Sequence, residues 1–416
     1  MKILKPQTLK GFRDFLPQEA RKRQYAIDIL KQVFESYGFE PLETPALEYE
    51  EILTGKYGEE GDKLMYRFED RGKRKVAMRY DQTVPLARVV AQYGNGLPMP
   101  FKRYQIQNVW RAENPQKGRY REFLQCDIDT VGLDTPLVDA EIINVAINAY
   151  KTLGFKNFKV LINDRSSFEG LSSHAISAID KLKKIGKTKV LNELVNKGKT
   201  SKQAASILSS IEGKQPTERL NVVFSYLKKF GVLESEYRFL PTLARGLDYY
   251  TSTIIEVETQ DYTSGSLGGG GRYDNLIGMF AGKQIPAVGF AFGFDRLIEA
   301  MTELKRFPKD LTATKVLVTI FPKEKSNKVK GDVKEKSIDC SLSLRSAGVS
   351  TELYLDENAS LEKQLKYADK KGIPYAIIIG PQEAAKNVVT LRNMKTREQI
   401  LVSQKDAITK IKNNFY

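Results

Sequence analysis

Histidine is almost absent from this chain: among 416 residues, His174 is the only one. Imidazole general bases, histidine-based triads and histidine metal sites are therefore excluded over almost the whole sequence. Cysteine is nearly as rare, and Cys126 and Cys340 lie in quite different contexts, which argues against a disulfide framework and a thiolate metal cluster. Any chemistry has to depend on arginine, carboxylate, amide and tyrosine side chains, without a metal held by the protein.

Long apolar runs are also lacking. No window approaches the roughly 18 consecutive apolar residues that a membrane span needs. The first residues, MKILKPQTLK, carry lysines but no following apolar core or cleavage site, so we expect no secretory signal. The sequence therefore predicts a soluble protein in the reducing cytoplasm.

Positive charge is in excess. Lysine and arginine number 66 against 51 aspartate and glutamate residues, which gives a formal net charge of +15. A basic protein is suited to binding a polyanion such as a nucleic acid, because neutralised phosphates release counterions. A lysine-rich protein with solvated lysine faces explains the charge equally well, so the charge alone does not decide between them.

Changes in composition and hydrophobic periodicity along the chain predict several successive segments. Residues 1–165 begin with an amphipathic helix over 18–37 and continue, over 65–130, with short β-rich runs separated by charged turns, which predict an antiparallel sheet. Residues 166–239 change to lysine-rich helical periodicity, which predicts a helical insertion. Sheet-type sequence returns over 240–310 and completes the first unit.

The remaining residues, 311–416, have a different pattern. Buried-type apolar runs such as KVLVTIF, VSTELYL and YAIIIG alternate with polar helical stretches. Apolar strands alternating with helices predict a small α/β domain with a mainly parallel sheet.

A polar hairpin is predicted over residues 108–132, NVWRAENPQKGRYREFLQCDIDTVG. If the first strand runs through the motif, its alternation places Arg111 and Glu113 on one face. The returning strand carries a second polar row, made of Phe123, Gln125, Asp127 and Asp129. Such a face is a poor hydrophobic core and a good floor for a polar ligand. The alternative is a solvent-exposed hairpin with ion pairs.

This hairpin resembles motif 2 of the class II aminoacyl-tRNA synthetases, and its run KGRYREFLQCDIDTVG is similar to the histidine-specific branch of that family. Further segments match the same branch in the same order: GFRDFLP at 11–17, MRYDQTVPLAR at 78–88, ARGLDYYTSTIIEVE at 244–258, GGGGRYDNL at 268–276 and GFAFGFDRL at 289–297. Of these, MRYDQTVPLAR resembles the family's amino-acid-binding loop. One glycine run would be weak evidence, but several ordered motifs are hard to produce by chance. The resemblance covers nearly the whole chain.

The resemblance implies an α+β fold, in which an antiparallel-sheet class II catalytic domain contains a helical insertion and is followed by an α/β anticodon-binding domain. It implies that ATP activates histidine to histidyl-adenylate, releasing pyrophosphate, and that histidine then passes to the 3′ end of its tRNA. ATP with Mg²⁺ enters as a substrate complex, and no tightly bound cofactor is expected. Residues 40–51 resemble motif 1, with Pro45 at the family's proline, and imply a two-fold homodimer.

Cations are required where a carboxylate is joined to a phosphate, because negative charge grows on the phosphate oxygens. The resemblance implies that Arg111 contacts the α-phosphate and that Arg245 assists the same step, so these two are the expected catalytic residues. For Arg245 the alternative is a structural ion pair, for instance with Asp248. The residues expected to bind ATP are Arg111, Glu113, Arg119, Phe123 and Arg296.

Adenine is expected between Phe123 and Arg296, which match the residues that stack on its two faces. Motif 3 departs slightly from the general class II pattern, because Ala291 replaces a glycine and Asp295 stands where glutamate is usual. Neither change removes Arg296, so we expect an intact nucleotide pocket.

Recognition of histidine calls for hydrogen-bond partners for both ring nitrogens and for the α-amino group. The residues that match the family's histidine site are Asp81, Gln82, Thr83, Arg111, Gln125, Asp129, Arg245, Tyr249, Tyr250 and Tyr273. For isolated tyrosines, packing in the core would be the more ordinary role. Ser252 stands where the family commonly has glycine.

Two further segments have both functional and ordinary interpretations. Gln116 and Lys117 resemble the region that meets the tRNA acceptor end, and the alternative is solvated charge. The four glycines of GGGGRYDNL suggest close approach of the backbone to a bound ligand, and the alternative is a flexible turn. His174 lies in the insertion, away from every motif, and we assign it no catalytic role.

Three rival functions follow from the same sequence. The first is a non-catalytic relative that serves as a regulatory subunit or tRNA sensor, which tends to lose the arginine motif or the tail. The second is a class II enzyme for proline, threonine or glycine, against which the RGLDYY segment argues. The third is a plain basic nucleic-acid-binding protein, which leaves the polar hairpin unexplained.

Overall fold

The computed structural model describes residues 4–54, 64–115, 118–245, 249–262, 265–308, 311–322 and 333–413. Two units make up the chain. The first extends to Arg306, apart from Pro17–Arg21, and the second contains Phe307–Tyr416. In the described part of the chain, no helix combines the length and the apolar character that crossing a bilayer requires.

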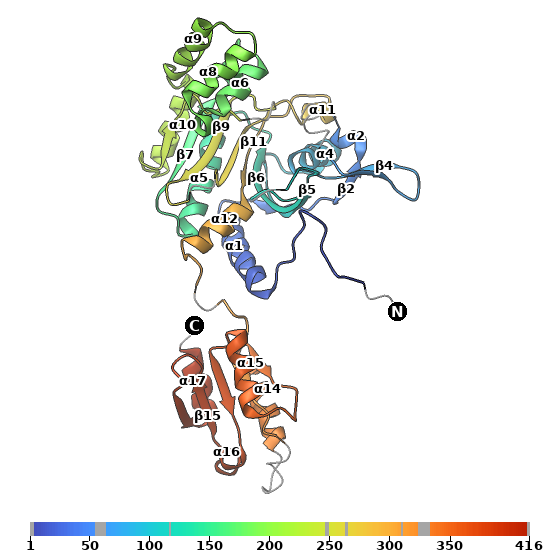
Figure 1. The fold of residues 1–416 in the computed structure, drawn as a ribbon, viewed down its shortest axis with the longest axis vertical. Coiled ribbons are helices and arrows are strands. Elements are labelled where there is room, and N and C mark those ends of the chain that lie inside the picture. Colours follow the sequence, from blue (N-terminus) through green and yellow to red (C-terminus); the bar gives the residue numbers. More distant parts are fainter. Residues whose placement is uncertain are drawn as a thin grey trace. The chain divides into compact units, whose positions relative to one another are not determined.

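An eight-stranded sheet organises the first unit, with the strand order β1-β5-β6-β11-β10-β9-β7-β8 (Figure 1). Neighbouring strands are antiparallel except at the two edges, where β1 pairs with β5 and β7 pairs with β8 in parallel. The strands are β1 (Glu40–Pro41), β5 (Phe101–Trp110), β6 (Glu122–Val131), β7 (Phe158–Asp164), β8 (Tyr237–Phe239), β9 (Thr253–Thr259), β10 (Gly268–Arg272) and β11 (Ala287–Phe292). The sequence reading had missed β7, which joins the insertion to the sheet.

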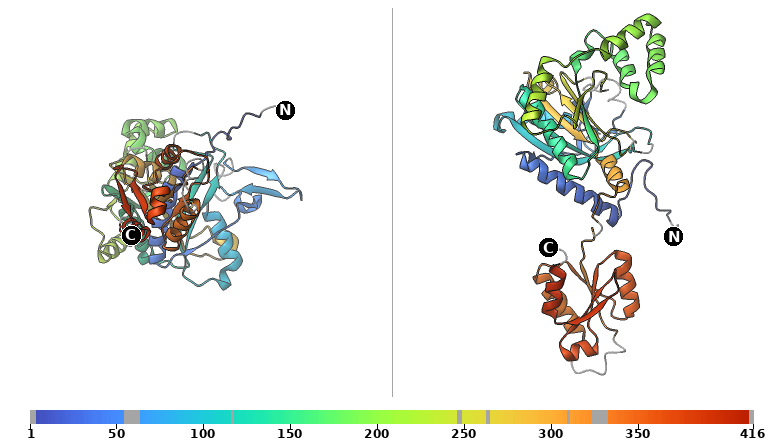
Figure 2. Two further views of the ribbon diagram at one scale, coloured as in Figure 1. Left: turned by 90° about the horizontal axis from the view of Figure 1, so that it is seen from below. Right: turned by 90° about the vertical axis from the view of Figure 1, so that its left-hand side faces the viewer.

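One face of this sheet is apolar and covered by helices. α1 (Pro17–Ser36), α5 (Pro136–Thr152) and α12 (Phe294–Glu303) lie along it (Figure 2). Phe292 of β11 is central there, with its ring centroid 5.5 Å from that of Phe34 on α1 and 5.4 Å from that of Tyr150 on α5. Burial of these large rings supplies much of the hydrophobic stabilisation of the unit.

A second, three-stranded sheet corrects the prediction of one sheet over 65–130. It contains β2 (Leu47–Tyr49), β4 (Lys75–Met78) and β3 (Arg67–Glu69), in that order. The segment MRYDQTVPLAR, expected to be a binding loop, instead leads into helix α4 (Thr83–Tyr93), which contains a buried apolar face. The turns of this region are α2 (Glu50–Leu53), η1 (Gly94–Gly96) and α11 (Gly278–Ala281).

The insertion is helical, as predicted, and its helices before residue 213 form the upper lobe of the first unit in Figure 1. After the turn η2 (Arg165–Phe168), its helices are α6 (Ser173–Asp180), α7 (Leu182–Ile185), α8 (Lys187–Asn196), α9 (Ser201–Glu212) and α10 (Glu218–Lys229). α6, α8 and α9 share a small core that includes Ala178, Leu194 and Ala204. A second cluster packs Ile176 and Ile179 of α6 against Ile254 of β9, which joins the insertion to the sheet.

The second unit is an α/β domain whose sheet is only half parallel, which corrects the mainly parallel prediction. The strand order is β13-β12-β14-β15-β16, where β12 is parallel to both neighbours and the last two pairings are antiparallel. Its strands are β12 (Val316–Val318), β13 (Thr351–Leu353), β14 (Tyr375–Ile378), β15 (Val389–Asn393) and β16 (Gln399–Val402). Its helices are α14 (Val333–Ser346), α15 (Leu361–Lys371), α16 (Pro381–Lys386) and α17 (Gln404–Lys412).

Candidate active site

A polar cavity of about 330 Å³ opens over the other face of the eight-stranded sheet. Its walls come from three distant stretches of the chain. They are Arg111, Glu113, Gly118, Arg119, Tyr120, Phe123, Leu124, Gln125, Arg245, Phe292, Gly293, Phe294, Asp295 and Arg296. The two arginines expected to act on the same phosphate, Arg111 and Arg245, therefore line one cavity although 134 positions separate them in the sequence.

The register of the sheet explains why this face is polar. One row of paired residues crosses five strands and consists of Gln105, Asp127, Ala291, Gly269 and Glu256. Because neighbours in register point to the same face, polar side chains from outer strands flank a strip of small residues in the middle. The strip leaves space above the sheet, and the polar groups border that space.

The glycine run serves the protein's own packing, and its close approach to a ligand stays a prediction. A Cβ added to Gly270 would lie 2.0 Å from the carbonyl oxygen of Gly289, on the neighbouring strand. At Gly269 the same atom would lie 2.2 Å from a guanidinium nitrogen of Arg245. The missing side chain of Gly269 is therefore what allows Arg245 to lie against the floor of the site.

Arg245 is held by an ion pair. Its Nη1 lies 3.1 Å from Oε2 of Glu256, on the adjacent strand β9. Burial alone would disfavour the cation, but Tyr250 and Glu256 reverse this effect and raise the pKa of Arg245 above its ordinary value. Asp248, the alternative partner considered from the sequence, lies outside the described residues.

Arg111 follows directly after strand β5, which ends at Trp110. The alternation used to place Arg111 and Glu113 on one strand face therefore does not apply, because neither residue belongs to the strand. Instead, Nε of Arg111 donates to the carbonyl oxygen of Tyr80 at 2.9 Å, and its guanidinium carbon lies 5.1 Å from the centroid of the Phe123 ring. These two contacts orient the guanidinium group of Arg111 toward the cavity.

The remaining residues expected to bind ATP border the same cavity. Nη1 of Arg296, on α12, donates to the carbonyl oxygen of Ser266 at 3.0 Å. Arg119 is half exposed and lies 3.9 Å from Glu113, a separation too long for a strong ion pair. Phe123 and Arg296 both line the cavity, but their stacking on adenine remains a prediction.

A buried acidic cluster lies beside the cavity, on β6. Asp129 is paired with the fully buried Arg103 at 2.7 Å and accepts a hydrogen bond from the hydroxyl of Tyr273. Asp127 accepts a hydrogen bond from the Gln125 amide at 2.6 Å. Burial raises the pKa of Asp127 to about 8, although the nearby Arg103 opposes this shift.

Three tyrosines are grouped next to this cluster. The ring centroid of Tyr249 lies 4.6 Å from that of Tyr250 and 5.9 Å from that of Tyr273. Burial raises the pKa of Tyr249 well above its ordinary value, and the neighbouring Tyr250 and Asp81 add to the shift. Burial also raises the pKa of Tyr273, so the hydroxyls of Tyr249 and Tyr273 stay protonated and able to donate hydrogen bonds at neutral pH.

The other expected histidine-binding residues lie at the start of helix α4, where Asp81 and Gln82 precede the helix and Thr83 is its first residue. Asp81 and Thr83 are buried at its start. Gln82 is completely buried, and its amide nitrogen donates to the main-chain oxygens of Gln107 and Gln125 at 2.9 and 3.2 Å. This amide therefore also fastens α4 to the sheet.

Most of the chain matches known family models, in two successive parts. A sequence model described as "Histidyl-tRNA synthetase" matches residues 11–215 and 168–297, and one described as "Anticodon binding domain" matches residues 316–414. The chain belongs to the histidyl-tRNA synthetase family.

Individual relatives are similar over almost their full length. A histidine–tRNA ligase from Cytophaga hutchinsonii is 38% identical over an alignment that covers 98% of this chain and 99% of its own. One from Gloeobacter violaceus is 41% identical over 94% and 95%. The crystal structure of histidyl-tRNA synthetase from Nostoc sp. PCC 7120 superposes with a TM-score of 0.85 at 30% identity, and covers 99% of this chain and 100% of that one. The predicted family and fold class are thus confirmed.

In this member of the histidyl-tRNA synthetase family, three residues of the site were not predicted from the sequence. Arg103 was detectable, since Arg103, Gln105 and Gln107 form a polar row at period two within a predicted strand. Glu256 and Asp180 were not, because only the fold brings β9 and α6 near Arg245. Burial raises the pKa of Asp180, and the charge of Arg245 lowers it in part. The expected tRNA-acceptor residues, Gln116 and Lys117, lie outside the described residues.

Proposed function

We propose that the cavity over the polar face of the sheet binds histidine and ATP side by side and joins the histidine carboxylate to the α-phosphate. As a member of its family the chain is an aminoacyl-tRNA ligase, a histidine–tRNA ligase, which activates histidine and transfers it to the 3′ end of its tRNA. The observation that carries the proposed site is the convergence of Arg111 and Arg245 on one cavity.

The first step needs positioning and charge. A carboxylate oxygen of histidine attacks the α-phosphorus, the bond to the β-phosphate oxygen breaks, and pyrophosphate leaves with Mg²⁺ as part of the substrate complex. Arg111 and Arg245 would stabilise the negative charge that grows on the phosphate oxygens, since preorganised cations act strongly where water is largely displaced. Glu113 lies at the same cavity and is the carboxylate we assign to the Mg²⁺ that ATP brings.

The histidine end of the site would be the acidic and phenolic cluster. Oε1 of Gln125 and Oδ1 of Asp127 are buried and have no hydrogen-bond partner among the described residues, so both can accept from a ligand. Their acceptors suit the α-amino group or a ring N–H of histidine. The further residues we assign to histidine are Asp81, Gln82, Thr83, Asp129, Tyr249, Tyr250 and Tyr273.

The nucleotide end would lie toward the motif 2 loop and α12. Phe123 and Arg296 would take the two faces of adenine, and Arg119 would reach the outer phosphates. For the second step, we keep Gln116 and Lys117 as the proposed contacts of the tRNA acceptor end.

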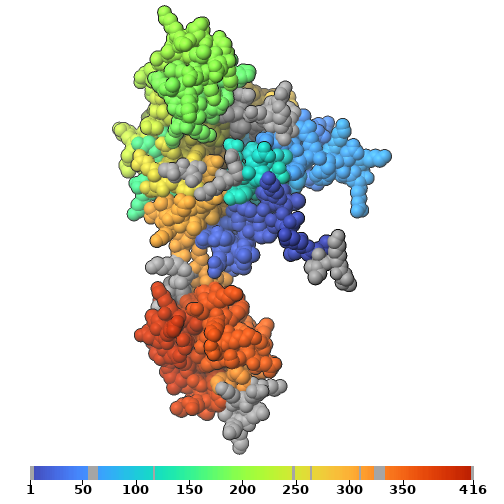
Figure 3. Space-filling view, viewed as in Figure 1, coloured from blue at the N-terminus to red at the C-terminus, as the bar shows by residue number. Residues whose placement is uncertain are grey.

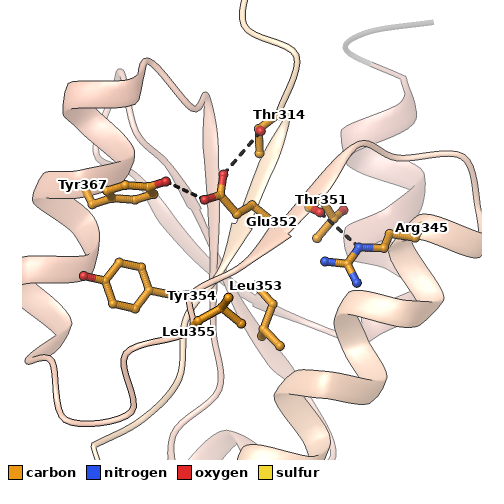
Figure 4. A pocket seen from close by; sticks show the side chains of 8 residues that line it. All are labelled: Thr314, Arg345, Thr351, Glu352, Leu353, Tyr354, Leu355 and Tyr367. Atoms are coloured by element: carbon orange, nitrogen blue, oxygen red, sulfur yellow. Dashed lines mark hydrogen bonds between the residues drawn. The ribbon is translucent and has the colours of Figure 1, made fainter.

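The second unit would read the anticodon through a hollow of about 690 Å³ (Figure 4). Tyr354 and Tyr367 meet edge to face there, 5.4 Å apart, beside the exposed Leu355. Unstacked bases bind such apolar and aromatic surfaces, and Arg345 at the same hollow can meet a phosphate. The change Tyr354→Ala should then weaken aminoacylation while it leaves ATP–pyrophosphate exchange unchanged.

A homodimer is the proposed assembly, formed through the three-stranded sheet. Tyr49 and Phe68 flank Val76 in register on one sheet face, and both rings are strongly exposed. An exposed apolar row of this kind is typical of a surface that another chain covers. Sedimentation of Phe68→Glu at micromolar concentration tests this: a monomer supports the proposal, and an unchanged dimer contradicts it.

A cytoplasmic location completes the proposal. Cys126 and Cys340 are buried free thiols, which fits a reducing compartment.

Exchange of pyrophosphate into ATP, measured with each amino acid in turn, tests the proposed function. We expect histidine alone to stimulate exchange. Stimulation by another amino acid, or by none, would contradict the assignment.

A further inference from the structure

The N-terminal motif GFRDFLP has no part in the proposed chemistry, yet the fold places it at the rim of the cavity. Nη2 of Arg13 lies 2.8 Å from Oδ2 of Asp295, and Nη1 of Arg23 lies 2.5 Å from Oδ1 of the same carboxylate. Asp295 is the second residue of α12, so both of its oxygens are bound by arginines from the N-terminal segment. α1 and α12 lie side by side in Figures 1 and 2.

Arg13 also contacts the loop of the motif 2 hairpin, between β5 and β6. Its guanidinium carbon lies 3.2 Å from the centroid of the Tyr120 ring, so the cation is stacked directly on that ring. Tyr120 lines the cavity beside Arg119. One side chain, Arg13, therefore joins Tyr120 to Asp295 across the rim.

The backbone strengthens this connection. The amide of Arg121 donates to the carbonyl oxygen of Gly11 at 2.9 Å, which adds the N-terminal segment to the edge of the hairpin. Gly11 has φ +90°, and a Cβ there would lie 2.8 Å from Cγ of Arg121, so this close approach requires glycine. In Figure 3 the dark-blue N-terminal residues lie against the cyan surface of the hairpin region.

Both ends of this connection adjoin residues of the nucleotide end. Tyr120 directly follows Arg119, and Asp295 directly precedes Arg296. We propose that Arg13 and Asp295 form a rim clamp, which holds Tyr120 and the start of α12 at the distance that ATP requires between Arg119 and Arg296. In this role Arg13 and Asp295 are positioning residues, which act through Tyr120 and Arg296. The proposal rests on the proposed nucleotide site.

The charges of the clamp have a second consequence. Asp295 neutralises two guanidinium groups that lie close to the cavity where a triphosphate would bind. Without its carboxylate, Arg13 and Arg23 would lose the anion that holds them at the rim, and Arg13 would no longer connect Tyr120 to the start of α12. Loss of Asp295 should therefore disturb ATP binding more than loss of a neutral contact would.

The test compares the KM for ATP with the KM for histidine in pyrophosphate exchange. Arg13→Gln should raise the KM for ATP about tenfold, which corresponds to the loss of one charge-assisted hydrogen bond, and leave the KM for histidine within about twofold. Asp295→Asn should give the same split, and Asp295→Glu should restore most of the ATP affinity because it keeps the charge. Tyr120→Leu combined with Arg13→Gln should add little to either single change, since both act through one contact.

Lys102→Gln is the matched control. Lys102 also pairs with a carboxylate, Glu141 at 2.9 Å, and also contacts an aromatic ring, Phe39 at 4.7 Å, with a similar exposure to Arg13, but it lies on the far part of β5. It should change neither KM.

Two results overturn the clamp. One is an unchanged KM for ATP in Arg13→Gln, and the other is an equal rise of both KM values, which would indicate a general loss of structure. Arg296→Ala is measured in parallel and reports on the nucleotide site itself. If Arg296→Ala raises the KM for ATP and Arg13→Gln does not, the clamp alone is wrong. If Arg296→Ala leaves the KM for ATP unchanged, the proposed nucleotide site fails, and the clamp fails with it.

Discussion

The two sides of strand β6 are equally buried and chemically opposite. Cys126 and Ile128 face the helices and are completely inaccessible, while Asp127 and Asp129, one residue along, point to the polar face of the sheet and are each only 3% exposed. On the first side burial removes apolar surface from water and stabilises the fold. On the second side burial removes carboxylates from water, which costs free energy unless partners are present. Because side chains alternate between the two faces of a strand, β6 stabilises the fold with one face and supplies polar groups to the site with the other.

The largest effect on stability is expected from the apolar side. Phe292→Ala leaves a cavity among Phe34, Tyr150 and Phe290, so the free energy of unfolding should fall by about 3–5 kcal/mol. Urea denaturation of the first unit measures it. Phe230→Ala, at an exposed position, is the matched control and should change stability little. A small loss for Phe292→Ala would mean that the helices do not depend on this ring.

On the polar side, the expected loss is in the rate of pyrophosphate exchange, and its free-energy equivalent is nearly as large. Arg245→Ala removes a cation aimed at the proposed phosphate position, so exchange should slow by about 10²–10³-fold, or about 2.7–4 kcal/mol of transition-state stabilisation. The unfolding midpoint should hardly move, because the arginine is not part of the apolar core. A rate within threefold of the parent would remove Arg245 from the mechanism.

A pH-dependent effect is expected at Asp127, whose pKa is raised from the ordinary value of 3.8 to about 8. Between these values the folded protein holds a proton that the unfolded chain has released. Stability should therefore fall as pH rises through this window, by about 1.4 kcal/mol per pH unit from this group alone. Asp127→Asn lacks this loss, so its stability relative to the parent should increase from pH 5 to pH 8. A constant difference across that range would contradict the raised pKa.

The smallest effect is expected at Tyr273. Tyr273→Phe removes the hydroxyl that donates to Asp129 but keeps the ring, so the binding free energy of histidine should weaken by about 1 kcal/mol. The KM for histidine should rise several-fold while the KM for ATP stays constant. An equal change in both would place Tyr273 in the structure generally, rather than at the histidine end.

Local patterns predicted much of the fold. The amphipathic period gave the first helix to within one residue at each end, since α1 spans Pro17–Ser36 where 18–37 was expected. The β-rich runs between charged turns also predicted the antiparallel strands β5 and β6, although β5 ends before Arg111. The prediction failed at α4, because the segment MRYDQTVPLAR resembles a binding loop of the family, whereas Thr83–Tyr93 form a helix with a buried apolar face. It failed again in the tail, because strand direction depends on connections rather than on strand composition.

The sequence by itself determined the family, the α+β class and the identity of the polar residues, because period-two and period-3.6 patterns and ordered motifs are local properties. Only the tertiary structure decided that Glu256 holds Arg245, that Arg103 neutralises Asp129 and that Arg13 reaches Tyr120 and Asp295. Those contacts join segments far apart in the chain, and their formation depends on sheet register and on space left by residues such as Gly269. No local pattern encodes either of these.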